Sequence, residues 1–277
     1  DNSLTLSGAC ELNAAVNISG SFAGSATCVV GTYSISLTPE ISTLTDGPHD
    51  LNISQTDLAE NTSTNTQFTW NRDTSLPASP IITSPSTSSY TSADPTLAIS
   101  GSCESDATVY LSLSGADIGN ALCASNSFSI DVSKSDGVWS FAVRQVDLAG
   151  NTSLTPASLQ WTRDSSIPSN QVITTPSSSQ VYSNGSNLTI EGTCTTNNSV
   201  EISGSATSSY SCSAGTFTFT VSASTDGSYS FNLKQKSPSA IYSGAETITW
   251  IRDTVRPTPL TATSPAQSPF YSNSATM

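Results

Sequence analysis

Six cysteines carry the most reactive side chains of this 277-residue chain, and they recur as three local pairs. The partners are 18, 20 and 18 residues apart: Cys10 with Cys28, Cys103 with Cys123, and Cys194 with Cys212. An even count paired in this way is typical of a disulfide framework in an oxidising compartment. A zinc site would need short C-x-x-C spacings or several histidines, whereas His49 is the only histidine. The pattern predicts three disulfides, each stabilising its fold by about 3 kcal/mol, in a secreted or cell-surface protein.

Two acidic segments could bind Ca²⁺, which takes oxygen ligands. "QTDLAENTS" at 55–63 and "QVDLAGNTS" at 145–153 offer the carboxylates and amides of Asp57, Asn61, Asp147 and Asn151. Calcium needs about six to eight oxygens, and two side chains per segment supply too few. Asp and Asn also stabilise turns by bonding to nearby backbone. The sequence favours a turn, with calcium as the weaker alternative and the only cofactor considered.

An Arg-Asp pair follows a tryptophan at three places. Each arginine lies two residues after the tryptophan, so on a strand both side chains point to the same face, where the arginine could stack on the ring or cap a core. The aspartates lie where one domain would join the next and could instead gather calcium. A structural role is the favoured interpretation. The pairs are Arg72-Asp73, Arg163-Asp164 and Arg252-Asp253.

His49 is the one residue that suggests a catalytic base. It aligns, however, with Trp139 and Tyr229 in the repeat described below, so the position is expected to require a flat ring. No nucleophile, base and orienting group recur or cluster elsewhere in the sequence. We therefore predict that the protein is not an enzyme and has no catalytic residues.

All of these residues lie within a sequence repeat of about ninety residues. Trp70, Trp161 and Trp250 recur at spacings of 91 and 89, within "WNRD", "WTRD" and "WIRD". Such a period indicates tandem modules. The predicted domains are 1–75, 76–166 and 167–256, followed by the leading strand of a further repeat at 257–277.

Alternation of apolar residues inside each repeat predicts β-strands. Thr, Ser, Val and Ile are abundant while strong helix formers are scarce, so almost no helix is expected. A "TDG" or "SDG" turn, a hairpin signal, precedes another alternating strand of each repeat at Asp46, Asp136 and Asp226. About seven strands in ninety residues fit a two-sheet sandwich. The predicted fold class is all-β: three tandem Greek-key β-sandwiches, each with one intradomain disulfide.

Charge and hydropathy exclude two classes of partner. Charged residues make up 10% of the chain, the net charge is -13 and the pI is about 4.1, so a nucleic acid backbone would be repelled. No apolar run approaches the roughly 18 residues that a membrane helix requires. We expect neither nucleic acid binding nor membrane insertion.

The segments "QVDLAGNTS" and "WTRDSSIP", with their copies "QTDLAENTS" and "WNRDTSLP", resemble the bacterial immunoglobulin-like repeats of large secreted and surface proteins. The resemblance extends over all three units. It implies immunoglobulin-like sandwiches that space, stiffen or display other parts of adhesins and fibres. In the third repeat "QKSPSAIYSGAET" replaces the D-x-A-x-N element, which is therefore dispensable there.

The end of the chain repeats a segment that elsewhere introduces a sandwich. "PIITSPSTSSY" at 80–90 and "QVITTPSSSQVY" at 171–182 precede the first alternating strand of repeats two and three, and "PLTATSPAQSPFY" at 259–271 has the same pattern. Repeat one begins without such a leader. An edge strand of this kind could be donated to another subunit. The residues predicted to do so are Pro259, Leu260, Ala262, Phe270 and Tyr271.

Three functions are compatible with these observations. The first is a structural segment of an extracellular bacterial fibre or adhesin stalk, an array about 100 Å long or more, whose partners are further immunoglobulin-like repeats of the same chain. The second is a filament subunit that pairs with other copies of itself by strand donation. The third is a carbohydrate-binding adhesin with a glycan or surface receptor. Its candidate aromatic platform is Tyr90, Tyr182, Tyr210, Tyr242 and Tyr271.

Overall fold

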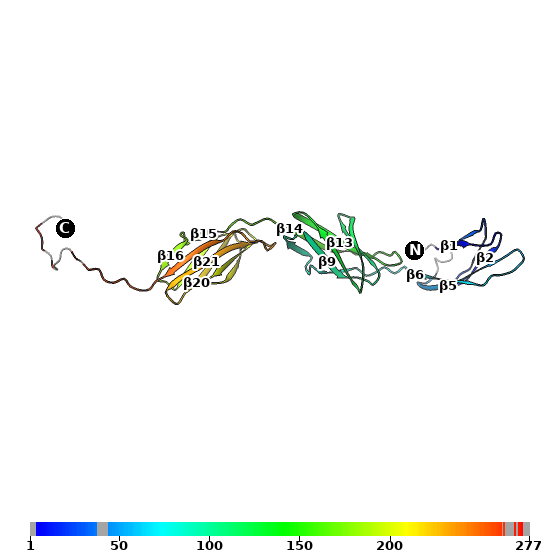
Figure 1. Cartoon of the computed structure of the whole chain (residues 1–277), viewed down its shortest axis with the longest axis horizontal. Helices are drawn as coiled ribbons and strands as arrows, with labels where there is room; N and C mark the ends of the chain where they lie inside the picture. The colour runs from blue at the N-terminus through cyan, green and yellow to red at the C-terminus, as the bar shows by residue number, and fades with distance from the viewer. Residues whose placement is uncertain (1–3, 38–43, 262, 264–268, 270, 274–277) are drawn as a thin grey trace. The chain divides into compact units, whose positions relative to one another are not determined.

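A computed structural model describes residues 4–37, 44–261, 263, 269 and 271–273. Within these residues the chain forms 22 strands and no helix (Figure 1). It divides into two compact units, Asp1–Asp164 and Ser165–Met277. The first unit holds sandwich one (β1 to β6) and sandwich two (β7 to β14), and the second holds sandwich three (β15 to β22).

Sandwich two has a three-stranded sheet in the order β12-β9-β7 and a five-stranded sheet in the order β11-β10-β13-β14-β8. All neighbours are antiparallel except β14 and β8, which are parallel. The chain crosses between the sheets repeatedly, as a Greek key does. The strands are β7 (Ile81–Ser84), β8 (Ser89–Ser92), β9 (Thr96–Ser102), β10 (Thr108–Leu113), β11 (Ala116–Leu122), β12 (Ser127–Ser133), β13 (Gly137–Val146) and β14 (Ala157–Arg163).

Sandwich three repeats this arrangement, with sheets β15-β17-β20 and β16-β22-β21-β18-β19. Its strands are β15 (Val172–Thr175), β16 (Gln180–Ser183), β17 (Asn187–Thr193), β18 (Ser199–Gly204), β19 (Ser208–Ser211), β20 (Thr216–Ser222), β21 (Gly227–Lys236) and β22 (Glu246–Arg252). The alternating residues of the inner faces form one separate core in each sandwich. Trp161 and Trp250 are the largest side chains buried in these cores.

Sandwich one has smaller sheets, β1-β4 and β3-β2-β5-β6. Among its described residues no strand takes the place of β7 or β8. Seven of those residues form its buried core, against twelve in each of the other two sandwiches. The strands are β1 (Thr5–Ala9), β2 (Ala15–Gly20), β3 (Gly24–Thr27), β4 (Thr32–Ser36), β5 (Gly47–Thr56) and β6 (Thr66–Arg72).

The predicted fold class is confirmed, with two corrections to the strands. The leading segment of repeat two forms two strands, because Pro85 has no N–H to continue the ladder and the chain passes from the sheet of β9 to the sheet of β14. The hairpins expected at Asp46, Asp136 and Asp226 are wrong, because the strands before and after each turn lie in different sheets. Strands β12 and β13 lie in different sheets, so the Ser-Asp-Gly turn is a crossover.

The three disulfides predicted from spacing are present. Each fastens the end of one strand to the end of the strand two positions later, in the opposite sheet, for example β17 to β19. Each bond therefore joins the two layers of its own sandwich. The bonds are Cys10–Cys28, Cys103–Cys123 and Cys194–Cys212, with Cα–Cα distances of 5.8, 5.9 and 6.1 Å.

Candidate functional site: the cystine and glutamine anchor

In every sandwich, the last inward-facing residue of the ten-residue strand is a glutamine. In β21 the inward positions are Tyr229, Phe231, Leu233 and then Gln235, which is 0% exposed. Burying an amide without partners would cost free energy, so each of its polar atoms requires a hydrogen bond. The equivalent residues are Gln55 in β5 and Gln145 in β13.

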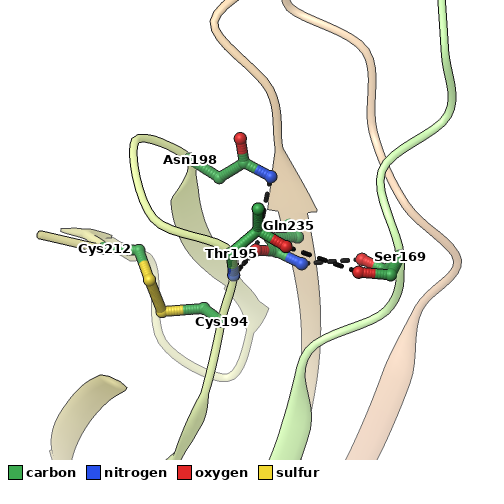
Figure 2. Close-up of a disulfide and its surroundings, with 6 residues drawn as sticks. All are labelled: Ser169, Cys194, Thr195, Asn198, Cys212 and Gln235. Atoms are coloured by element: carbon green, nitrogen blue, oxygen red, sulfur yellow. Dashed lines mark hydrogen bonds between the residues drawn. A yellow bond between two sulfur atoms is a disulfide. The ribbon is translucent and has the colours of Figure 1, made fainter. Parts of the chain in front are cut away.

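Figure 2 shows how Gln235 meets this requirement beside the disulfide. Its Oε1 accepts hydrogen bonds from the backbone N of Thr195, next to Cys194, and from Asn198 Nδ2 at 3.3 Å. Its Nε2 donates to the carbonyl oxygen of Ser169 at 2.6 Å. One buried amide thus ties the cystine loop to the segment that enters the sandwich ahead of β15.

Gln145 makes the same connections in sandwich two. Its Oε1 accepts from Glu104 N at 3.0 Å, and its Nε2 donates to Ala78 O at 2.6 Å. Asn151 adds a bond from its Nδ2 to Asp73 O at 3.1 Å. The backbone that follows β6 is therefore held at two points by sandwich two.

Gln55 has the first half of this pattern, because its Oε1 accepts from Glu11 N at 2.8 Å. The other bond of the pattern runs from the glutamine Nε2 to a carbonyl oxygen of the leading segment. The described residues of sandwich one do not include such a segment. We call the glutamine, its disulfide and the leading-segment carbonyl the anchor. It holds backbone in place and contains no group arranged to attack a substrate.

The opposite end of each sandwich is closed by an ion pair. Arg252 Nη1 lies 2.6 Å from Asp226 Oδ1, and the Asp226 carboxylate also accepts from the amide and hydroxyl of Thr254 at 2.9 and 2.8 Å. These bonds from Thr254, with the nearby charge of Arg252, hold the pKa of Asp226 below its usual range. Sandwiches one and two have the same pair, Arg72 with Asp46 and Arg163 with Asp136. The arginine thus bonds to the turn aspartate, a partner that its spacing from the tryptophan does not reveal.

A lowered pKa in the folded protein makes this end of the sandwich sensitive to acid. The Asp226 carboxylate contributes its full stabilisation above its pKa in the unfolded chain, about 3.9. This contribution is lost as pH falls through the lower pKa of the folded protein. We expect Asp226→Asn to lower the urea midpoint of sandwich three at pH 7 and to have little effect near pH 2. Glu191→Gln, on the exposed face of β17, is the control. An equal effect of Asp226→Asn at both pH values would contradict this explanation.

The D-x-A-x-N element forms a turn in which the aspartate bonds to its own loop. Asp147 Oδ1 accepts from Asn151 N at 2.8 Å and Oδ2 accepts from Asn151 Nδ2 at 2.9 Å. Asp57 and Asn61 make the same two bonds. In sandwich three the Ser237 hydroxyl accepts from Ile241 N at 3.2 Å, which explains why the acidic residue is dispensable there. The carboxylates of Asp57 and Asp147, two of the four weak calcium candidates, thus already accept hydrogen bonds within the turn.

His49 lies at a position that holds a ring in all three repeats. Its Nε2 donates to Thr45 O at 2.9 Å, and Trp139 Nε1 and Tyr229 Oη donate to the equivalent carbonyls, four residues earlier, at 3.1 and 2.8 Å. The His49 ring also packs on Trp70 with centroids 5.6 Å apart. The prediction that this position requires a flat ring is confirmed.

The tyrosines considered for sugar binding do not form one surface within sandwich three. Tyr182 is on β16 and Tyr210 is on β19, at opposite edges of a five-stranded sheet and so about 19 Å apart. Tyr242 donates to Glu201 Oε2 at 2.9 Å. In sandwich two, Tyr90 packs against the core. A shared aromatic platform is therefore not assembled from Tyr182 and Tyr210.

The predicted strand-donation residues lie in the segment after β22. Leu260 is 100% exposed, and Pro259 and Tyr271 are exposed as well. Ala262 and Phe270 lie outside the described residues. In the part of the chain that the structure describes, no group of three or more His, Cys, Asp or Glu side chains could hold a metal ion. No helix there is long and apolar enough to cross a membrane.

No protein-family model matches the sequence, and no curated protein matches it. Among solved structures, the chain is similar to fibronectin(III)-like modules of CbhA from Clostridium thermocellum, with 13% identity, a TM-score of 0.47, and coverage of 62% of this chain and 93% of that one. It is similar to titin domains A168–A170 at 11% identity, TM-score 0.40, covering 90% and 92%. It is also similar to the BSP domain of a biofilm-associated protein at 13% identity, TM-score 0.25, covering 84% and 53%.

Proposed function

We propose that this chain is a non-catalytic, load-bearing segment of an extracellular bacterial fibre or adhesin stalk. The observation that carries the proposal is the anchor. In sandwiches two and three a buried glutamine bonds both to the backbone beside the disulfide and to the backbone that enters from the preceding repeat. Force applied along the chain would reach each sandwich at this point.

Three further features support a mechanical role. Each disulfide joins the two sheets of its sandwich, so the sheets cannot separate fully while the bond is intact. The ion pairs Arg163–Asp136 and Arg252–Asp226 close the end of the sandwich at which β14 or β22 terminates. A proline follows each adjacent Arg-Asp sequence within four residues and restricts the backbone between repeats. These prolines are Pro77, Pro168 and Pro257. An oxidising, extracellular environment is the one in which such disulfides persist.

Single-molecule extension of the full chain tests this role. We expect three discrete unfolding events at measurable force, one for each sandwich. With the disulfide intact, a loop of 18 to 20 residues stays closed. Reduction should therefore lengthen each event by about 60 Å, since an extended chain spans roughly 3.5 Å per residue.

The result that would contradict the proposal is extension without discrete events in the oxidised protein. Such a chain would yield gradually under load and could not hold a distal part of a stalk in place. The reduced protein is the internal control, because its sequence is the same and only the cross-links differ.

A further inference from the structure

Sandwich three has a groove on the outer face of its five-stranded sheet. The groove has a volume of about 400 Å³, and its lining includes Ser203, Ser209, Lys234 and Tyr242. The first three belong to β18, β19 and β21, in positions that alternate with core residues such as Ile202. Because side chains alternate across a strand, these three point away from the core.

A short edge strand leaves this groove open. In sandwich two, β11 begins at Ala116, and Asp117 near its start accepts a hydrogen bond from Arg144 Nη2 at 2.6 Å. In sandwich three, β19 begins only at Ser208, which pairs with Ile202. Among the described residues of sandwich three, none therefore corresponds to Asp117, and the outer face of β18 is uncovered at this point.

The position of Arg144 is taken by Lys234 in sandwich three. Two residues later, Lys236 Nζ lies 3.4 Å from Glu201 Oε1 and 5.2 Å from the centre of the Tyr242 ring. Tyr242 donates a hydrogen bond to Glu201 Oε2 at 2.9 Å. The charge of Glu201 is thus compensated by Lys236. Lys234 is exposed and forms no ion pair with any residue that the structure describes, so the groove has one uncompensated positive charge.

The other two sandwiches have different residues at the aligned positions. In sandwich one all four are small and neutral, although the strands pair in the same register. The four side chains are therefore not required by the fold. The positions of Glu201, Lys234, Lys236 and Tyr242 hold Asn17, Ser54, Thr56 and Thr62 in sandwich one, and Tyr110, Arg144, Val146 and Thr152 in sandwich two.

The charge of the chain also differs between its two units. Residues 1–164 have sixteen acidic and four basic side chains, whereas residues 165–277 have five acidic and four basic ones. Two of the three lysines of the chain, Lys234 and Lys236, lie in or beside the groove. A strongly acidic surface repels an anionic ligand, and an uncompensated cation attracts one. Sandwich three is therefore the part of the chain best suited to an anionic ligand.

The side chains of the groove match an acidic sugar. The negative face of an aromatic ring attracts the C–H groups of a sugar ring, and Tyr242 is 41% exposed. Sugar hydroxyls exchange hydrogen bonds with the hydroxyls and the carboxylate that Ser203, Ser209 and Glu201 supply. A carboxylate on the sugar would pair with Lys234. An acidic peptide also offers carboxylates but has no ring of hydroxyls, so the hydroxyls of the groove favour the sugar.

We propose that this groove binds a hexuronate residue of an acidic polysaccharide. The sugar ring would pack on Tyr242, its carboxylate would pair with Lys234, and its hydroxyls would bond to Glu201 and Ser209. One aromatic ring is enough for this contact, so the site does not need a platform of several tyrosines. The inference goes beyond the load-bearing role and does not rest on it, because a chain without that role could bind the same sugar.

NMR titration of the full chain with trigalacturonate tests the proposal. We expect saturable changes in the amide shifts of residues 201–209, 234–236 and 242, and an affinity that falls as salt is added. The methyl-esterified trimer has the same rings and hydroxyls without the charge, and it should bind about fivefold more weakly. No saturable change, changes confined to other residues, or equal binding of the ester or of triglutamate would overturn the proposal.

Two substitutions test the assigned contacts. Lys234→Gln and Tyr242→Thr should each weaken trigalacturonate binding about fivefold. Lys234 is exposed, and threonine is the residue of the other two sandwiches at the position of Tyr242, so the calorimetric transition of sandwich three should stay in place. Lys134→Gln in sandwich two is the matched control, since it changes the net charge equally. Equal losses for Lys134→Gln and Lys234→Gln would overturn the proposal.

Discussion

Replacement of Gln235 by leucine is expected to destabilise sandwich three by about 3 kcal/mol. The substitution leaves Thr195 N, Ser169 O and the Asn198 amide without their partner, and each buried polar group left unsatisfied costs about 1–3 kcal/mol. For a domain of this size, the loss corresponds to a shift of about 15 °C in the melting temperature. Differential scanning calorimetry of the full chain measures it, since the three cores are separate and one transition should move.

Gln55→Leu is the matched control for this prediction. The substitution is identical and the position is equivalent, but the side chain of Gln55 bonds to Glu11 N and has no leading-segment carbonyl among the described residues. We expect a shift less than half as large. Equal shifts for Gln55→Leu and Gln235→Leu would show that the bond to the leading segment contributes little.

The fold was largely predictable because its signals are local and repeat. Period-2 alternation identifies the inner faces, and the ninety-residue period separates the three cores. The cysteine pairing follows from spacing in the same way. The Ser-Asp-Gly turn at Asp136 shows the limit of local signals, because a turn sequence does not reveal whether the strands that flank it share a sheet. Here β12 pairs with β9, whereas β13 pairs with β10 and β14.

The anchor was missed for a different reason. The alternation of β21 marks Gln235 as inward-facing, so a buried amide could have been expected from the sequence. Its partners could not, since Ser169 O lies 66 residues earlier and is a backbone atom that any residue type would supply. Likewise Arg252 and Asp226 are 26 residues apart and meet only because β21 and β22 are paired. Contacts of this kind depend on topology.

Removal of the Cys194–Cys212 disulfide, by replacing both cysteines with alanine, should lower the free energy of unfolding of sandwich three by about 3 kcal/mol. The bond closes a loop of 18 residues, and its loss restores the conformational freedom of the unfolded chain. The effect should be confined to one of the three calorimetric transitions. A variant that shifts two transitions would show that the sandwiches do not unfold independently.

The same double replacement at Cys10 and Cys28 gives the more severe outcome. Its loop has the same length of 18 residues, so the loss in free energy is expected to be similar, at about 3 kcal/mol. The margin is smaller, however, because the described core of sandwich one has fewer buried residues and an exposed Phe68. Sandwich one should therefore be largely unfolded at 37 °C, which its loss of hydrogen-exchange protection would report. The opposite result would be a folded sandwich one in the Cys10/Cys28 variant and an unfolded sandwich three in the Cys194/Cys212 variant. It would show that sandwich one does not depend mainly on its disulfide for stability.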